Sequence, residues 1–431
     1  MPCLNIWIDG ALVGEWILSR ENVQSFRYDA GWIATGHGPL SHSLPISAEL
    51  EIHGPAVGSY FDNLLPERTE KRKQLHMLFR TESEQPFSLL TVIGRDCTGA
   101  AQILPADEDP AKFSEAVAGD LTSDEVESML EGLSESGMGV VREDTPVCAT
   151  LSGAQDKTTL HLNQLAWRAP YALSAATHIF KPAIGILGNG IDLSKSVENE
   201  HLCMRLTAAL GLPTANTSMK TFGSIRTLLV ERFDRRWTRD KRLLRLPQED
   251  LCQALGVPPS RKYQSDGGPG IHEALQFLKA SDDPQADRCM FMKAQIVYWL
   301  LGATDGHAKN FSIFLYPGGG FRLTPLYDVM SLQPAFATQH IKRNRMKLAM
   351  SVGDQRHYVL DTIQPRHFLQ SAQRAGMPVS DVETVFGEIM KAAPKANEIL
   401  RDGESGIPAH IRRAILEGFK GRLALIESHG S

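Results

Sequence analysis

The feature that most constrains the fold of this chain is an apolar segment that ends in a group of polar side chains. Residues 290–301, MFMKAQIVYWLL, are apolar on nearly every side, which predicts a buried helix. Residues 302–315, GATDGHAKNFSIFL, place Asp305, His307 and Asn310 directly after it. A carboxylate buried without a partner is strongly unfavourable. We therefore expect this loop to line the interior or a cleft, where a metal ion or a substrate compensates Asp305.

The spacing of two of these residues matches a known catalytic loop. Asp305 and Asn310 repeat the D-x-x-x-x-N spacing of protein kinases, in which the aspartate accepts the proton of the attacking hydroxyl and the asparagine binds magnesium. Residues 311–315 predict a strand, 316–320 a tight turn, and 321–329 a returning strand that ends at Asp328. Magnesium prefers such oxygen ligands. The alternative is that Asp305 caps a turn and His307 is an ordinary core histidine.

Two upstream segments suit phosphate binding. Ser152, Gly153 and Ala154 precede a strand that begins near Lys157, and small residues let backbone N–H groups approach phosphate oxygens. An ordinary β-turn is the alternative. Lys181 lies among apolar neighbours in THIFKP, where it faces phosphates or reaches solvent from an edge strand.

Two further segments have kinase-like and ordinary readings. Glu198 and Glu200 begin the next predicted helix. They either pair with Lys181, as a helix glutamate does in kinases, or are first-turn acids that face the helix dipole. Glu231 and Phe233 end an apolar strand. They either form a hinge that offers backbone groups to adenine or are an ordinary strand end with a surface salt bridge.

The chain changes character along its length. Residues 1–105 alternate in short runs and predict a β-rich module, and residues 106–146 predict an acidic helical connector. Residues 147–240 predict a β/α region, and residues 241–431 a mostly helical lobe.

Composition narrows the class of protein. Hydrophobic residues make up 42% of the 431 residues and charged residues 22%, as in ordinary globular proteins. The net charge of −5 does not favour nucleic-acid binding by the whole chain. The six cysteines are scattered without a C-x-x-C pair, which predicts reduced thiols and no zinc site. Without a signal-peptide pattern or an apolar window of membrane-spanning length, we expect a cytoplasmic protein.

Several motifs together resemble one known family. FDNLLPE, SGAQDK, THIFKP, VENE, VERFDRRW, RLPQEDLCQ, KYQSDGGPGI, GATDGHAKNFS and RLTPLYDV, in this order, resemble the HipA family. That family comprises serine/threonine-protein kinase toxins of type II HipBA toxin–antitoxin systems. The resemblance covers essentially the whole chain. It implies an α+β, protein-kinase-like, two-lobed fold with an N-terminal β-rich module and a mostly helical C-terminal lobe.

The resemblance also implies a non-specific serine/threonine protein kinase that uses ATP and Mg²⁺. Asp305 resembles the catalytic base, and Asn310 and Asp328 resemble the metal ligands. The positions that resemble the ATP-binding residues are Ser152, Gly153, Ala154, Gln155, Asp156, Lys157, Lys181, Glu231, Arg232, Phe233, His307, Ala308, Lys309, Asn310, Tyr327 and Asp328.

One position departs from the family pattern. The family autophosphorylates a serine just before the phosphate loop, which ejects the loop and inactivates the kinase. Thr150 stands at the matching position and Ser152 lies close by. We expect Thr150 to be the main autophosphorylated residue and Ser152 a secondary one.

The family's partners and target are implied in the same way. The partner is HipB, a helix-turn-helix antitoxin dimer that binds operator DNA, with the toxin as co-repressor, nucleoid-associated in that complex. The implied substrate is an aminoacyl-tRNA synthetase, typically the glutamyl enzyme, whose phosphorylation halts translation and induces dormancy and persistence. The basic run 340–347 is a solvated loop or approaches DNA phosphates. Two rivals remain: an ATP-binding co-repressor scaffold and a small-molecule kinase.

Overall fold

The chain divides into two compact units, each made of several segments. The first contains residues 1–182, 220–260 and 313–321, and the second contains residues 183–219, 261–312 and 322–431. The computed structural model describes residues 1–110, 119–136, 140–142, 145–146, 153, 155–170, 174–403 and 405–430. The four segments predicted from the sequence divide the chain more finely and stay a prediction.

The N-terminal residues of the first unit form an antiparallel five-stranded sheet in the order β4-β3-β2-β1-β5. Apolar and polar residues alternate in this part of the sequence, and this pattern accounts for the strands, because alternate side chains point to opposite faces of a strand. The strands are β1 (Cys3–Ile8), β2 (Ala11–Leu18), β3 (Gln24–Tyr28), β4 (Glu51–His53) and β5 (Gln102–Pro105), and the helices of this part are α1 (Ala30–Ala34), α2 (Pro55–Asp62), α3 (Thr69–Phe79) and α4 (Pro86–Ile93).

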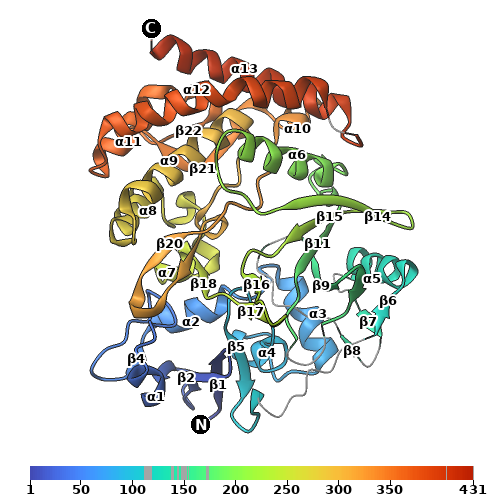
Figure 1. The fold of residues 1–431 in the computed structure, drawn as a ribbon, viewed down its shortest axis with the longest axis vertical. Helices are drawn as coiled ribbons and strands as arrows, with labels where there is room; N and C mark the ends of the chain where they lie inside the picture. The colour runs from blue at the N-terminus through green and yellow to red at the C-terminus, as the bar shows by residue number, and fades with distance from the viewer. Residues whose placement is uncertain are drawn as a thin grey trace. The chain divides into compact units, whose positions relative to one another are not determined.

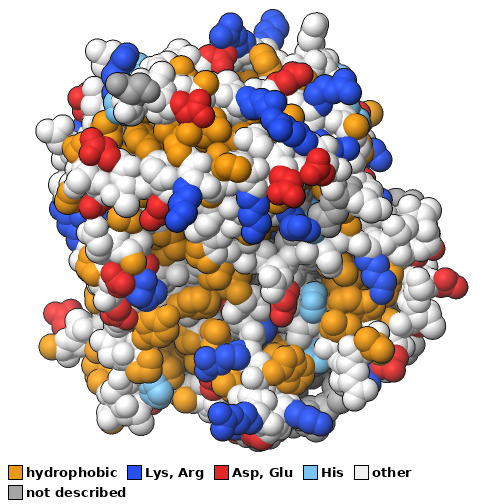
Figure 2. All heavy atoms as spheres, turned by 45° about the horizontal axis from the view of Figure 1, so that its top comes forward, with side chains coloured by type: hydrophobic (Ala, Val, Ile, Leu, Met, Phe, Trp, Pro, Cys, Tyr) orange, Lys and Arg blue, Asp and Glu red, His pale blue; other side chains and the backbone are white. Residues whose placement is uncertain are grey.

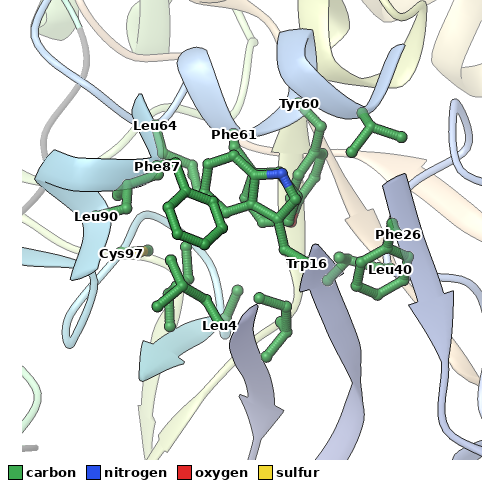
Figure 3. Close-up of a cluster of buried hydrophobic side chains, with 14 of the residues drawn as sticks. Leu4, Trp16, Phe26, Leu40, Tyr60, Phe61, Leu64, Phe87, Leu90 and Cys97 are labelled. Carbon is green, nitrogen blue, oxygen red and sulfur yellow. The ribbon is translucent and has the colours of Figure 1, made fainter. Parts of the chain in front are cut away.

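Aromatic side chains pack between this sheet and its helices. The rings of Trp16, from β2, and Phe61, from α2, stack with 3.8 Å between centroids and 10° between planes. Phe87, from α4, meets the edge of Trp16 at 4.9 Å. Figure 3 shows these rings at the centre of the buried cluster, with Leu4 and Phe26 from neighbouring strands. Such burial contributes about 1.5–3 kcal/mol per large side chain.

A second, six-stranded sheet has the order β14-β15-β11-β9-β10-β6. Helix α5 (Ser123–Ser136) packs on it, because Val126, Met129 and Leu130 bury one apolar face against Phe180 and Leu229. The predicted connector thus contributes a helix to the core of this sheet. The strands are β6 (Asp120–Leu121), β9 (Thr158–Asn163), β10 (Ala166–Arg168), β11 (His178–Pro182), β14 (Thr217–Phe222) and β15 (Ile225–Glu231).

Short elements complete the β structure. A three-stranded sheet has the order β18-β19-β20, and four two-stranded ribbons pair β7 with β8, β12 with β13, β16 with β17 and β21 with β22. Their bounds are β7 (Val140–Arg142), β8 (Thr145–Pro146), β12 (Gly185–Ile186), β13 (Asp192–Leu193), β16 (Arg235–Trp237), β17 (Leu243–Arg245), β18 (Gln248–Asp250), β19 (Ser312–Leu315), β20 (Phe321–Leu323), β21 (Lys347–Val352) and β22 (His357–Val359).

The second unit is mostly helical and is built around α9, which is buried along most of its length as its sequence predicts. Helices α6, α8, α11, α12 and α13 all contact α9. Helices α12 and α13 lie side by side at the C-terminal end of the chain (Figure 1). The helices from α6 onward are α6 (Ser196–Ala209), α7 (Leu251–Ala254, in the first unit), α8 (Ile271–Phe277), α9 (Pro284–Leu301), α10 (Gln333–Ala337), α11 (Pro365–Arg374), α12 (Val379–Asp402) and α13 (Ala409–His429).

The β-rich N-terminal and helical C-terminal character predicted from the sequence is confirmed by these elements. Over the described part of the chain, no helix combines the length and apolarity that crossing a membrane requires. On the face drawn in Figure 2, Lys and Arg side chains are interspersed with Asp and Glu side chains.

Candidate active site

The polar loop predicted from the sequence begins where α9 ends. Gly302 takes a left-handed conformation, φ 67° and ψ 33°, which glycine adopts without steric cost. Side chains bind the last carbonyls of the helix: Ser331 Oγ donates to Leu301 O at 2.6 Å, and the buried Arg422 donates to Leu300 O from Nη2 at 3.0 Å. The start of the loop is therefore fixed by the core of the second unit.

Hydrogen bonds within the loop join the two residues of the D-x-x-x-x-N pair. Asn310 Nδ2 donates to Asp305 O at 2.7 Å, and His307 N donates to the same carbonyl at 2.8 Å. Asn310 N donates in turn to His307 O at 2.9 Å, in a 3₁₀ turn over Ala308–Asn310. With its nitrogen used inside the loop, Asn310 presents its amide oxygen as an acceptor.

The carboxylate of Asp305 is accessible. Its side chain is 59% exposed, and Oδ1 lies 3.9 Å from His307 Nε2. Tyr263 Oη donates to Asp305 Oδ1 at 2.5 Å, across 42 residues of sequence. No role was predicted for Tyr263, although its segment KYQSDGGPGI is one of the family motifs.

His307 is buried and uncharged at neutral pH. Its side chain is 4% exposed, and its ring lies nearly perpendicular to the ring of Tyr263, with 4.8 Å between centroids and 84° between planes. Burial, with the charges of Lys262 and Lys309, lowers the pKa of His307 to about 3, and Asp328 opposes the change. Nδ1 of His307 is buried without a hydrogen-bond partner.

The segment that carries Asp328 leaves the predicted strand early. β20 ends at Leu323, so the expected strand over 321–329 is wrong in extent. The reason is that Leu326 pairs elsewhere: its N donates to Pro213 O at 2.8 Å, and its O accepts from Ala215 N at 2.8 Å. Asp328 then takes a positive φ of 60°, which is uncommon for a residue with a side chain.

Tyr327 ties the Asp328 segment to the polar loop. Its hydroxyl donates to Lys309 O at 2.8 Å and lies 2.6 Å from Ser312 Oγ. Because Lys309 precedes Asn310 and Tyr327 precedes Asp328, these bonds hold the two predicted metal ligands on adjoining stretches of chain. The structure therefore brings together Asp305, His307, Ala308, Lys309, Asn310, Tyr327 and Asp328.

Helix α9 supplies one wall behind this arrangement. Tyr298 is 2% exposed, and its hydroxyl has no hydrogen-bond partner. Burial raises the pKa of Tyr298 well above its usual range, and the charge of Asp328 adds to the increase. A Cβ on Gly306 would lie 2.3 Å from Tyr298 Cδ2, so only glycine lets the loop run this close to the ring.

These residues fit a magnesium ion. The Asn310 amide and the Asp328 carboxylate are hard oxygen ligands, and a magnesium ion in a kinase completes its shell with phosphate and water. Among the described residues, no group of three or more His, Cys, Asp or Glu side chains suited to a metal occurs. The Tyr298 hydroxyl and His307 Nδ1 are both buried without a hydrogen-bond partner, and the charge of Asp328 acts on both residues. They mark a polar environment that the protein alone does not satisfy.

Lys181 belongs to the first unit, where it is confirmed on a strand. It lies in β11, paired with Leu228 of β15, and it is 5% exposed. Since β11 has neighbours on both sides, the edge-strand alternative is wrong. Burial of a lysine inside a sheet requires compensating contacts.

The described part of the predicted phosphate loop lies against the N-terminal module. Gly153 forms an isolated parallel β-bridge with Pro66. Its φ is 109°, and a Cβ on Gly153 would lie 2.8 Å from Lys157 Nζ. Lys71 of α3 donates to Asp156 at 3.1 Å. Gln155 Nε2 donates to Pro182 O at 3.3 Å. Thr150, Ser152 and Ala154 lie outside the described residues.

The predicted hinge follows β15, which ends at Glu231. Arg232 N donates to Thr177 O at 2.9 Å, and the ring of Phe233 meets Phe314 at 5.8 Å and 87°. The Arg232 side chain is 2% exposed and points into the first unit, where it binds Asp234 with two hydrogen bonds. Any contact of Arg232 with a nucleotide would therefore use its backbone.

Comparison with known proteins gives two family matches. The model of the HipA-like C-terminal domain matches residues 149–397, and the model of the HipA N-terminal domain matches residues 4–104. This chain belongs to the HipA family. A Sinorhizobium fredii protein named as a kinase, Y4mE, is 35% identical over 342 residues, or 76% of this chain and 77% of that protein. The serine/threonine-protein kinase toxin HipA of Shewanella oneidensis is 29% identical over 320 residues, covering 71% and 69%.

A solved structure supports the HipA fold. The HipA chain in a complex of HipA, HipB and operator DNA from Shewanella oneidensis matches with a TM-score of 0.81 at 22% identity, over 99% of this chain and 98% of that one. The fold class predicted from the sequence is thereby confirmed.

Buried ion pairs join the two HipA domain regions within the first unit. Asp96, from the HipA N-terminal domain region, binds Arg232 at 3.2 Å and Arg235 at 2.8 Å, both from the C-terminal domain region. Burial raises the pKa of Asp96, but the charges of Arg235, Arg232 and Arg245 outweigh burial and hold it below its usual value. The sequence analysis did not predict this cluster, since nothing local in the sequence marks Asp96 as a partner of Arg232 in the predicted hinge.

Proposed function

We propose that this chain is an ATP-dependent serine/threonine protein kinase and the toxin of a toxin–antitoxin module. The observation that carries the proposal is the loop in which Asn310 Nδ2 binds Asp305 O. That bond joins the two residues that share the D-x-x-x-x-N spacing of kinases, and the Asp305 carboxylate is accessible. Membership in the HipA family, with a kinase toxin among the relatives, supports the same activity.

The proposed reaction assigns one role to each group. The acceptor hydroxyl gives its proton to Asp305 as its oxygen bonds to the γ-phosphorus of ATP. The bond from that phosphorus to the bridging oxygen breaks, and ADP leaves with the electron pair. Magnesium, when bound, neutralises charge on the phosphates. Asn310 and Asp328 would hold it, Lys181 would contact the α- and β-phosphates, and backbone groups of 231–233 would meet adenine. Positioning and charge neutralisation are what a loose phosphoryl transition state requires.

The proposed partners follow from the relatives. The Shewanella oneidensis HipA structure contains HipB and operator DNA. We extend this to a HipB-type antitoxin dimer for our chain, with operator DNA bound mainly through the antitoxin and the chain as co-repressor. The proposed substrate is an aminoacyl-tRNA synthetase of the glutamyl type, whose phosphorylation would halt translation.

Autophosphorylation is proposed at Thr150, with Ser152 as a secondary acceptor. Mapping of phosphate by mass spectrometry after incubation with ATP tests it. If phosphate is found on neither Thr150 nor Ser152, the proposed autophosphorylation is wrong.

The main test is transfer of γ-labelled phosphate from ATP to proteins of a cell extract and to purified glutamyl-tRNA synthetase. We expect the wild type, in the presence of Mg²⁺, to label a protein on serine or threonine. Asp305→Asn should lower the rate of transfer by at least about 100-fold. Transfer to small alcohols instead of proteins would favour a small-molecule kinase. No transfer at all, with operator repression intact, would favour a scaffold.

A further inference from the structure

The segment 261–270 is folded into a compact turn that presents Tyr263 to the polar loop. Tyr263 O accepts from Asp266 N at 3.0 Å and from Gly268 N at 2.9 Å. A Cβ on Gly268 would lie 1.8 Å from Arg261 O, so the turn closes only on a glycine. Gln264 Oε1 accepts from Ser351 N at 2.7 Å, which anchors the turn to β21. The Tyr263 backbone is thus held independently of its side chain.

The Tyr263 side chain contacts the polar loop at two points. Its hydroxyl donates to Asp305 Oδ1 at 2.5 Å, and its ring packs nearly perpendicular to the ring of His307. The backbone of the preceding residue also takes part, since Ala308 N donates to Lys262 O at 3.3 Å. A hydroxyl that donates to a carboxylate at this distance forms a strong, charge-assisted bond.

This bond matters because the carboxylate of Asp305 is open to solvent. Its side chain is 59% exposed, whereas its backbone carbonyl is held by Asn310. An exposed aspartate samples several rotamers. A phenol on Oδ1 selects one rotamer and directs the carboxylate toward a fixed point.

We propose that Tyr263 is a positioning residue that holds the Asp305 carboxylate in the orientation that receives the acceptor's proton. The phenol keeps its own proton throughout, so it neither gives nor takes a proton in the transfer. The inference rests on the proposed kinase function, because it needs Asp305 to be the base. A misplaced base slows phosphate transfer without weakening nucleotide binding, since correct placement of the base stabilises the transition state and not the bound ATP.

The test compares Tyr263→Phe with the wild-type full chain in transfer of γ-labelled phosphate from ATP, with label on the chain itself and on extract proteins as the two probes. Phenylalanine keeps the ring on His307 and loses one oxygen. We expect kcat to fall by about 10- to 100-fold, with the KM for ATP and the thermal midpoint unchanged within error. Tyr316→Phe is the matched control, since Tyr316 is exposed and its hydroxyl makes no hydrogen bond to any described residue.

A double-variant comparison separates positioning from a structural role. Asp305→Glu keeps a carboxylate but moves it by one methylene, so the phenol no longer orients it as in the wild type. If Tyr263 acts through Asp305, adding Tyr263→Phe to Asp305→Glu lowers the rate by less than about twofold.

Four results would overturn the inference: an unchanged rate in Tyr263→Phe, a faster rate (a phenol that blocks the acceptor), a loss that appears in the KM for ATP, or the full loss repeated in the Asp305→Glu background. Near wild-type transfer by Asp305→Asn would instead overturn the proposed function. If Asp305→Asn is inactive and Tyr263→Phe is normal, only the role of Tyr263 fails.

Discussion

Arg232 Nη1 and Asp96 Oδ2 lie 3.2 Å apart in a buried ion pair, although 136 residues separate them in sequence. Arg232 also binds both carboxylate oxygens of Asp234, at 3.0 and 2.9 Å, and Arg235 bonds to the same two aspartates. The N-terminal module therefore fixes the residue that directly follows the end of β15. The proposed nucleotide hinge would gain rigidity from these ion pairs, because the side chains cannot leave without exposing unpaired charge.

We predict that Asp96→Ala destabilises the first unit by about 3–5 kcal/mol, because it removes one of the carboxylates that neutralise the buried guanidinium groups of Arg232 and Arg235 and leaves Asp234 between two positive charges. Urea denaturation followed by tryptophan fluorescence measures the loss. Glu131→Ala, at an exposed position of α5, is the control and should change stability by less than about 0.5 kcal/mol. A similarly small change in Asp96→Ala would show that the cluster contributes nothing.

A second buried carboxylate predicts a pH dependence. Glu249 is 0% exposed, its Oε1 accepts from His42 N at 3.0 Å, and its Oε2 has no partner. Burial raises the pKa of Glu249 to about 8, and the charge of Asp250 acts in the same direction. A raised folded-state pKa gives stability that is full below the ordinary value near 4.5 and is lost as pH rises through 8.

Glu249→Gln should therefore be more stable than the wild type at pH 9, by a few kcal/mol, because glutamine cannot ionise yet keeps an oxygen for His42 N. At pH 5 the two proteins should differ little. Thermal midpoints measured from pH 5 to pH 9 provide the comparison. Parallel curves for the two proteins over that range would contradict the prediction.

The local parts of the site follow from the sequence, whereas its long-range contacts do not. The strand under Lys181, the strand that ends at Glu231 and the loop from Asp305 to Asn310 depend on short patterns that the backbone obeys locally. The conformation of Asp328 does not, since Leu326 leaves its hairpin to pair with residues 213–215.

Tyr263 and Asp96 show the same limit. Each lies far in sequence from the residue it binds, Asp305 and Arg232 respectively, and only packing of the whole unit brings the pairs together. No local sequence pattern around a tyrosine or an aspartate indicates which distant residue it contacts. The motifs therefore identified these segments without assigning roles to Tyr263 and Asp96. Thr150 and Ser152 lie outside the described residues and stay predictions.

Gly306 provides a test of the loop path. Gly306→Ala places a Cβ 2.3 Å from the Tyr298 ring, which forces the loop that carries Asp305 to shift. Since a shift of about 1 Å at a catalytic group costs on the order of 100-fold, we expect kcat to fall by that amount. Gly387→Ala, on the exposed side of α12 with no atom within 4 Å of the new Cβ, should leave kcat unchanged. Equal activity of the two variants would mean that the loop tolerates displacement.

Asp328→Asn tests the proposed metal site. An amide keeps one oxygen toward the cation but removes the negative charge, so the Mg²⁺ concentration for half-maximal phosphate transfer should rise by about 10-fold or more. Folding should be unimpaired, because asparagine tolerates the positive φ of this position as aspartate does. Asp354→Asn, at an exposed turn, is the control for the loss of one charge. The assay titrates Mg²⁺ at saturating ATP with the thermal midpoint measured in parallel. An unchanged Mg²⁺ requirement in Asp328→Asn would remove Asp328 from the metal site and leave Asn310 to be tested with other oxygen donors of the loop.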